Sequence, residues 1–317
     1  MSFSDARPRS AGTWRVGRFA GVELLAKPSL LVMGVILVVL FAPRFESQTQ
    51  TNPYVIAAVF VLVLYASVLL HEIAHVVAAR SFGMRVPSVT LHLLGGETAI
   101  EGESRTPWQE LATAIVGPLV SLGIGLAARQ VAESVEPGVL HDIVALIGSI
   151  NILVAVFNML PGLPLDGGRV FKAVVWQLTG HEATGTRFAA WIGRLAAVGL
   201  VVATLLWLQR TGFSDDRWTF DLIISGLVAW FLWEGAGHAL AQARRTARVD
   251  LLDARTLLEP GEAPEGAPRL PVDIRGQVLL RAMAARPAET YAVVERDGSI
   301  AGILRTSRVD EAYRRSR

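Results

Sequence analysis

The residues best suited to chemistry are two histidines and a glutamate in the run His71-Glu72-Ile73-Ala74-His75. On a helix, positions i and i+4 lie on one face, so both imidazoles point to one place while Glu72 lies beside them. Two imidazoles and a carboxylate suit zinc and leave a fourth position for water. Zinc lowers the pKa of that water, and a neighbouring carboxylate takes its proton as it attacks a peptide carbonyl. The run therefore predicts a hydrolytic zinc site with Glu72 as the general base.

The run lies inside a strongly apolar stretch, Pro53–Ala79. Ionisable residues inside a membrane span are costly and mark functional positions by default. The alternatives are a polar contact between helices or a proton relay. The sequence contains no cysteine, so a metal here needs histidine and carboxylate ligands.

A third ligand is expected where the later stretch Val139–Leu160 ends, in the sequence NMLPGLPLDGG from Asn158 onward. Its prolines and glycines break the helix. His71 lies nine residues before Arg80, about 13 Å from the inner end of its own helix, close to the depth of that break. Asp166 is the carboxylate there, and its alternative role is that of a turn residue before two glycines. We therefore predict that Asp166 completes the site.

The composition indicates a membrane protein. Of 317 residues, 52% are hydrophobic and 18% charged, with a mean hydropathy of +0.42, whereas a soluble globular protein carries more charge. The net charge of +2 is too small to indicate nucleic-acid binding. Six apolar stretches stand out, and most are long enough to cross about 30 Å of hydrocarbon. They are Pro28–Ala42, Pro53–Ala79, Leu111–Ala128, Val139–Leu160, Phe188–Leu208 and Phe220–Leu240. The first of them is short, and to cross the membrane it is expected to need either the preceding Val22–Ala26 or a thinned bilayer.

Basic residues predict the orientation of these spans. With a cytoplasmic N-terminus, the inner segments contain eleven Lys and Arg residues and the outer loops four, which favours both termini in the cytoplasm. Arginine and alanine are abundant and lysine scarce, as in proteins of GC-rich, bacterial genomes. We predict a multi-pass protein of the bacterial cell (inner or plasma) membrane. Its predicted parts are a cytoplasmic N-terminal segment, a membrane-embedded metalloprotease domain and a cytoplasmic α/β unit, at residues 1–27, 28–243 and 250–317.

The two motifs together resemble the site-2 protease family of intramembrane zinc metalloproteases, of the bacterial type. HEIAH in one span is paired with NMLPGLPLDGG at the broken end of a later span, in the order of the family. Asn151, Phe157 and Arg169 also fit its bacterial members.

The resemblance implies a fold, a cofactor and roles for individual residues. The fold is an α-helical polytopic membrane protein with about six transmembrane helices and a small membrane-associated β element. One zinc ion per chain is bound by His71, His75 and Asp166, and Glu72 is catalytic. Asn158 polarises the scissile carbonyl or positions the substrate.

The implied substrate is a transmembrane protein in the lipid bilayer, cleaved in or near its membrane segment during regulated intramembrane proteolysis. In the family, a strand near a Gly-Gly element pairs with extended substrate. Here Val89–Leu94 alternates in polarity before Gly95 and Gly96, which is consistent with an edge strand that a substrate augments. The alternative is an ordinary amphipathic surface hairpin.

The tail resembles one half of a cystathionine-β-synthase-type (CBS) module. After a loop at Pro260–Pro271 it shows a helix at Gln277–Ala285, strands at Tyr291–Glu295 and Ile300–Leu304 joined by an Asp297-Gly298 turn, and a helix at Ser307–Arg314. Such modules come as tandem pairs, and one unit is visible here. Adenine-nucleotide binding by the tail is therefore left open. The alternative role of the tail is to form a homodimer.

Two other functions compete with proteolysis. A metal-ion transporter or sensor could use the same His/Asp cluster, although the glutamate between the histidines is superfluous for transport and no internal repeat is found. An inactive scaffold is the third hypothesis, and the complete ligand set argues against it. Glu234 and His238 are expected to snorkel or to bond between helices, and His92 is expected in solvent at a membrane interface.

Overall fold

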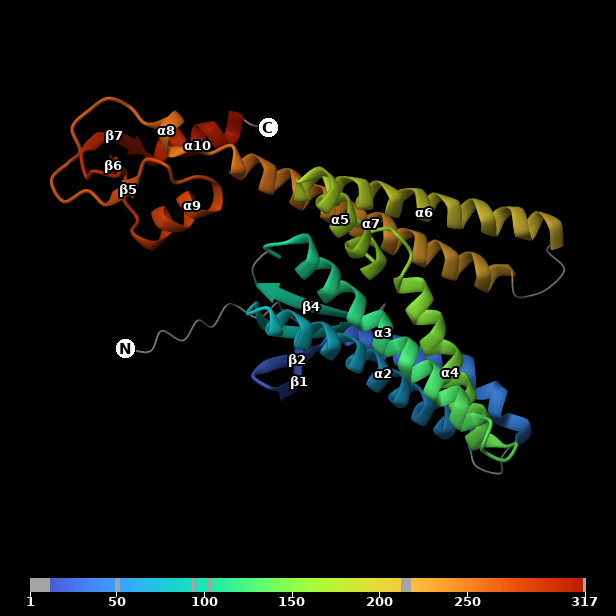
Figure 1. Ribbon diagram of the computed structural model, residues 1–317. Helices are drawn as coiled ribbons and strands as arrows, with labels where there is room; N and C mark the ends of the chain where they lie inside the picture. The colour runs from blue at the N-terminus through green and yellow to red at the C-terminus, as the bar shows by residue number, and fades with distance from the viewer. Residues whose placement is uncertain (1–11, 49–51, 93–94, 102–103, 212–217, 316–317) are drawn as a thin grey trace. The chain divides into compact units, whose positions relative to one another are not determined.

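The structure is a computed structural model that describes residues 12–48, 52–92, 95–101, 104–211 and 218–315 (Figure 1). Within these ranges six helices are long and apolar enough to cross a membrane. The prediction of six spans is therefore confirmed. The helices are α1 (Pro28–Phe41, extended by the 3-10 helix η1, Ala42–Gln48), α2 (Pro53–Ser81), α3 (Pro107–Ala132), α4 (Val139–Asn158), α6 (Glu182–Thr211) and α7 (Trp218–Asp250).

Three of these helices start with proline, which fits the first turn because its missing N–H needs no partner there. The side chain of Asn52 caps α2 by accepting from the backbone N–H of Tyr54 at 2.9 Å. Thr106 caps α3 in the same way by accepting from Gln109 at 3.3 Å. Because α2 has 29 residues, it is about 43 Å long and exceeds the hydrocarbon thickness.

A four-stranded sheet covers the C-terminal end of α2. Its order is β1-β2-β3-β4, with β2 and β3 parallel and the outer pairs antiparallel. Val22 and Val89 from the sheet pack on Val76 and Ala79 of α2. The strands are β1 (Trp14–Phe19), β2 (Val22–Ala26), β3 (Arg85–His92) and β4 (Gly95–Glu101).

For each of two stretches in this region, one of the alternatives that the sequence left open is wrong, and for the second stretch the other alternative, a hairpin, is present because β3 pairs antiparallel with β4. Val22–Ala26 does not lengthen the first span, because it forms strand β2 and pairs on both sides. The stretch beginning at Val89 is not an edge strand, because β3 lies between β2 and β4, and Leu94 lies outside the described residues. Strand β4 pairs with β3 on one side, and on its other side no strand pairs with it among the described residues, so β4 is an edge strand.

The chain leaves α4 at Asn158 and forms a tight irregular segment before α5 (Asp166–Thr179) begins. Helix α5 was not predicted, although Val170, Val174 and Leu178 recur every four residues along it. Gly180, at φ +73°, ends it in the left-handed conformation that glycine adopts without strain. Asp166 is thus the first residue of a helix rather than a turn residue.

Helix α6 supports this irregular segment from the side. The backbone N–H of Leu163 donates to the carbonyl of Ala189 at 3.1 Å. A Cβ added to Gly193 would lie 2.0 Å from the carbonyl oxygen of Leu163, so α6 packs directly on the loop backbone. Leu165 at the end of the segment is buried against Ala197 of α6 and Leu232 of α7.

The C-terminal part has a core of its own, which includes Leu279, Tyr291 and Leu304. The chain forms two compact units, each with most of its contacts within itself. The boundary lies between Ala236 and Gly237, inside the continuous helix α7. The predicted boundaries at 243 and 250 stay predictions, as do the CBS resemblance, the homodimer and the nucleotide. The elements are α8 (Ala254–Leu257), β5 (Arg269–Pro271), α9 (Gly276–Ala285), β6 (Thr290–Val294), β7 (Ile300–Arg305) and α10 (Thr306–Arg315).

The two predicted strands and the two predicted helices of the tail are present, within one or two residues at their ends. The predicted loop Pro260–Pro271 ends instead in a short strand, β5, which pairs in parallel with β6. The turn between β6 and β7 uses Gly298 at φ +84°. The Asp297 carboxylate accepts from the Ser299 backbone N–H at 2.9 Å. Hydrogen bonds from the Ser299 hydroxyl and backbone N–H hold the pKa of Asp297 below its usual range.

We expect Gly193→Ala to destabilise the protein, because the new methyl group collides with a backbone oxygen and α6 must move away from the loop. The free energy of unfolding in detergent should fall by about 1–3 kcal/mol, seen as a lower thermal midpoint. The matched control is Gly199→Ala on the same helix, where no described atom lies within 4 Å of an added Cβ. Equal effects of the two substitutions would contradict the packing.

Candidate metal centre

His71 and His75 lie on one face of α2, and both side chains are buried. The Nδ1 atom of His75 lies 2.7 Å from the carbonyl oxygen of Thr113. A carbonyl only accepts, so Nδ1 donates the proton, and the lone pair of Nε2 faces the interior. Nδ1 of His71 contacts the buried Ser121 hydroxyl at 2.9 Å. Both rings are therefore held from behind with Nε2 forward, as metal-binding histidines are.

The first turn of α5 brings Asp166 to these two nitrogens, as predicted. Its Oδ2 lies 3.1 Å from Nε2 of His71 and 3.3 Å from Nε2 of His75, and the two nitrogens are 3.2 Å apart.

This triangle of donor atoms fits zinc. A tetrahedral ion bound at about 2.0–2.1 Å separates its ligand atoms by about 3.3–3.4 Å, close to the three distances found here. One oxygen and two nitrogens are also ligand types that zinc accepts. The three side chains could therefore hold one zinc ion with little movement.

Gly117 of α3 lies directly against the two imidazoles. An added Cβ there would come within 2.3 Å of Nε2 of His75 and 2.6 Å of Nε2 of His71. Only a glycine lets the backbone of α3 approach this closely without moving the rings. On the side of α3, the candidate metal centre is therefore bounded by the backbone of that helix rather than by a side chain.

Glu72 is buried next to the centre and is held by strand β4. The hydroxyl of Thr98 donates to Oε2 of Glu72 at 2.6 Å. A Cβ on Gly96 would lie 2.3 Å from Cγ of Glu72, so this predicted substrate-binding residue gives the glutamate its space. Gly95 pairs with His92 across β3 and β4.

A cavity of about 690 Å³ joins the three predicted ligands, Glu72 and Asn158. Asn158 ends α4, and its Nδ2 donates to the carbonyl of Val154 at 3.1 Å. His92, which was expected in solvent near a membrane interface, is half-buried and also lines this cavity. The remaining wall is largely apolar, with Leu153, Phe157, Val228 and Phe231.

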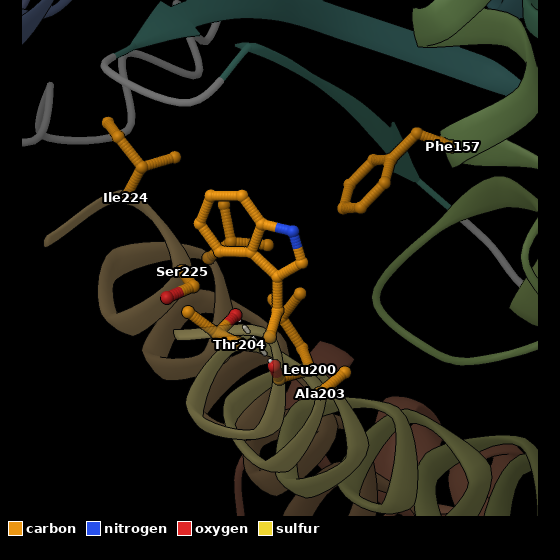
Figure 2. Close-up of a pocket in the computed structure, with 8 residues that line it drawn as sticks. Phe157, Leu200, Ala203, Thr204, Ile224 and Ser225 are labelled. Carbon is orange, nitrogen blue, oxygen red and sulfur yellow. Dashed lines mark hydrogen bonds between the residues drawn. The ribbon is translucent and has the colours of Figure 1, made fainter. Parts of the chain in front are cut away.

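A second, apolar cavity of about 490 Å³ adjoins the first, because Phe157 and Val228 line both. Figure 2 shows its lining, with Phe157 on one side and Ile224 and Ser225 of α7 on the other. Leu200 and Thr204 of α6 complete the floor. The space around the centre thus continues between helices α6 and α7.

Comparison with known proteins assigns this arrangement to a family. Residues 59–135 and 124–203 match the peptidase family M50. A Synechocystis protein named as a zinc metalloprotease is 32% identical over 302 residues, which cover 92% of this chain and 76% of that protein. Rip3 of Mycobacterium tuberculosis, also named as a zinc metalloprotease, is 32% identical over 300 residues, covering 91% and 73%. This chain belongs to peptidase family M50, the site-2 protease family.

The M50 protease is accordingly a zinc metalloprotease of the site-2 protease type and a multi-pass membrane protein, with Zn²⁺ as its cofactor. The solved structure of the site-2 protease from Methanocaldococcus jannaschii shares its fold. The TM-score is 0.52 at 23% identity, over 72% of this chain and 95% of that chain.

A buried charge network joins α3 to α5 behind the centre of the M50 protease. Nε of Arg169 lies 3.1 Å from Oε1 of Glu110, and Nζ of Lys172 lies 3.6 Å from the same oxygen. Ser104 donates to the other oxygen of Glu110 at 2.6 Å. Since Arg169 is one turn after Asp166 on α5, this pairing fixes the helix end that presents the carboxylate.

Several residues that shape the centre are not identified by the sequence patterns described above. Thr113, Ser121 and Glu110 on α3, and Thr98 on β4, each touch a side chain that was predicted. Glu110 lies in the first turn of an apolar helix, and an ionisable residue within such a helix is the sequence feature that indicates a functional or paired carboxylate. The backbone carbonyl of Thr113 has no sequence signature.

We expect Gly117→Ala to remove zinc from the purified protein, because the methyl group would displace both imidazoles. Zinc affinity should fall by at least about tenfold, measured as metal content after dialysis against a graded chelator. Gly123→Ala is the control on the same helix, since no described atom lies within 4 Å of its added Cβ. Full zinc content in Gly117→Ala would show that the rings are not where the structure has them.

We expect Glu110→Gln to be strongly destabilising, because it leaves the cation of Arg169 without its carboxylate, whereas Lys172 keeps Glu182 at 2.6 Å. Breaking a buried ion pair on one side costs about 3–5 kcal/mol. Thermal unfolding should show this loss, together with weaker zinc retention as α5 loosens. The exposed Glu133→Gln at the other end of α3 should change neither quantity, and similar losses in both variants would refute the network.

Proposed function

We propose that this M50 protease hydrolyses a peptide bond in or near the transmembrane segment of a membrane-protein substrate, with Glu72 as the general base. The observation that carries the proposal is the convergence of three zinc-type donor atoms within 3.3 Å of one another, beside a buried carboxylate. They lie among helices long enough to cross a membrane.

In this proposal His71, His75 and Asp166 bind the zinc ion. Bound zinc supplies a Lewis acid that lowers the pKa of water and polarises a peptide carbonyl. The hydrogen bonds of the two Nδ1 atoms keep the imidazoles in one orientation.

Glu72 accepts the proton of the attacking water and passes it to the amine that leaves. Its position next to His71 in sequence puts it in the same cavity. The hydroxyl of Thr98 fixes one carboxylate oxygen and leaves the other to the cavity. A carboxylate with one oxygen held by a hydrogen bond and the other free to accept a proton is already oriented for general-base catalysis.

We assign substrate binding to Gly95, Gly96 and Asn158. Strand β4, which contains both glycines, has a free edge among the described residues and can accept an extended peptide as a further strand. Asn158 lines the cavity and has a second amide hydrogen that is not used by Val154. It can therefore donate to the scissile carbonyl.

The biological setting that we propose is regulated intramembrane proteolysis in a bacterial plasma membrane, with both termini in the cytoplasm. The excess of Lys and Arg in the segments assigned to the cytoplasmic side supports this orientation. Membership of a family of zinc metalloproteases favours proteolysis over metal transport.

We expect Glu72→Gln to abolish cleavage of a single-span test substrate while zinc stays bound, because glutamine keeps the shape but cannot take a proton. Loss of a general base lowers the rate by about 10²–10⁴-fold. Cleavage is followed in proteoliposomes by gel and mass spectrometry, with metal content measured in parallel. Glu46→Gln, at an exposed carboxylate in η1, is the control. Undiminished cleavage by Glu72→Gln would remove Glu72 from its role.

A further inference from the structure

Arg194 is a cation in an apolar part of helix α6 that the catalytic centre does not use. Its guanidinium carbon lies 5.3 Å from the ring centre of Trp191 on α6 and 4.7 Å from that of Trp233 on α7. Within the described residues no hydrogen bond or ion pair to Arg194 is found, and its Nε is buried without an acceptor. Two tryptophan faces attract the charge but accept none of the in-plane N–H groups. The outer N–H groups therefore need an acceptor from outside the chain.

The position of Arg194 along α6 places it near a membrane surface. Arg210 lies sixteen positions after Arg194 along the chain, and Trp207 lies sixteen positions after Trp191. At 1.5 Å per residue each pair is about 24 Å apart, close to the hydrocarbon thickness of about 30 Å. Tryptophans at such a spacing mark the two interfaces of a bilayer. An arginine that snorkels from this level reaches the phosphates of the lipid head groups.

The surface around Arg194 combines positive charge with exposed apolar side chains. Arg187, two helical turns earlier on the same face, is exposed. Trp191 is 55% exposed and Trp233 44% exposed. Leu195, which follows Arg194, is also exposed and can contact an acyl chain. Two cations above an apolar surface match a lipid with a net negative head group better than a zwitterionic one.

We propose that Arg194, between Trp191 and Trp233, binds the head-group phosphate of an anionic phospholipid. The planar guanidinium donates through its outer N–H groups in the fork geometry that suits phosphate oxygens. Arg187 adds a second positive charge at the head group, and the acyl chain lies along Leu195. The site is independent of the proposed cleavage chemistry.

This lipid site lies behind the segment that leads to Asp166. Gly193 and Ala189, on the same two turns of α6, contact the backbone of Leu163. A lipid bridging Trp191 of α6 and Trp233 of α7 therefore holds both helices where they support the loop. Anionic lipid should steady the loop without touching the zinc ligands.

The test is native mass spectrometry of the full-length protein, released from nanodiscs of phosphatidylcholine mixed with phosphatidylglycerol. The wild type should keep phosphatidylglycerol in preference to phosphatidylcholine. In Arg194→Gln this preference should fall about fivefold, the size expected for one arginine at an anionic surface. Arg210→Gln, an exposed arginine at the other end of α6, should keep it. An unchanged preference in Arg194→Gln, or an equal loss in Arg210→Gln, would overturn the proposal.

Two further arms keep the result specific. Trp233→Leu removes one stacking face without touching the charge and should also lower the preference, which covers the case in which Arg194→Gln fails to fold. Inorganic phosphate is added to the wild type as a separate probe. If it displaces phosphatidylglycerol, the site takes free phosphate from water and the lipid assignment fails. If Arg194→Gln alters only the cleavage of substrates with an acidic residue, the ligand is a peptide and the lipid assignment also fails.

Discussion

The structure depends on bringing three charged or polar side chains, the candidate zinc ligands, together among membrane helices without leaving any of them unpaired. His71, His75 and Asp166 meet within hydrogen-bond distance, and water is scarce at such a depth. Each group therefore needs a second partner from the protein. Thr113 and Ser121 supply these partners to the imidazoles. Helix α3 is consequently part of the candidate metal centre although none of the candidate ligands lies on it.

The same constraint explains why the centre is built on close backbone contacts. A carboxylate can reach two imidazoles on α2 only if the chain stops being helical after α4, and non-helical backbone in a membrane must be covered by protein. Helix α6 covers it, with Gly193 against the carbonyl of Leu163. Small residues permit this approach in membrane helices, where packing rather than the hydrophobic effect holds helices together. The charge pair of Arg169 with Glu110 then fixes the start of α5 from the opposite side.

The sequence was sufficient to predict the spans and the meeting of the ligands, because both follow from strong local patterns. Apolar runs identify membrane helices, and the spacing of His71 and His75 defines a helix face. The errors concern pairing between distant segments. Val22–Ala26 is as apolar as the start of a span, but it pairs with β1 and β3. Period-two alternation cannot tell an inner strand from an edge strand, which is why the sequence left both an edge strand and a hairpin open for the stretch that forms β3. Partners that act through backbone atoms, such as the carbonyl of Thr113, leave no trace in residue type.

Strand β4 connects the two halves of the proposed chemistry. Gly96 and Thr98, which hold Glu72 in place, belong to the strand whose edge is free among the described residues. A peptide that paired with this edge would lie about 4.8 Å from the backbone that supports the base. The bound peptide would be extended. In a helical substrate the scissile carbonyl is hydrogen-bonded to the helix backbone, whereas in an extended peptide it is free of that bond. The strand would thereby open the substrate and align it with Glu72 in one step. In the proposed function, this coupling would give the small sheet a role beside the candidate metal centre.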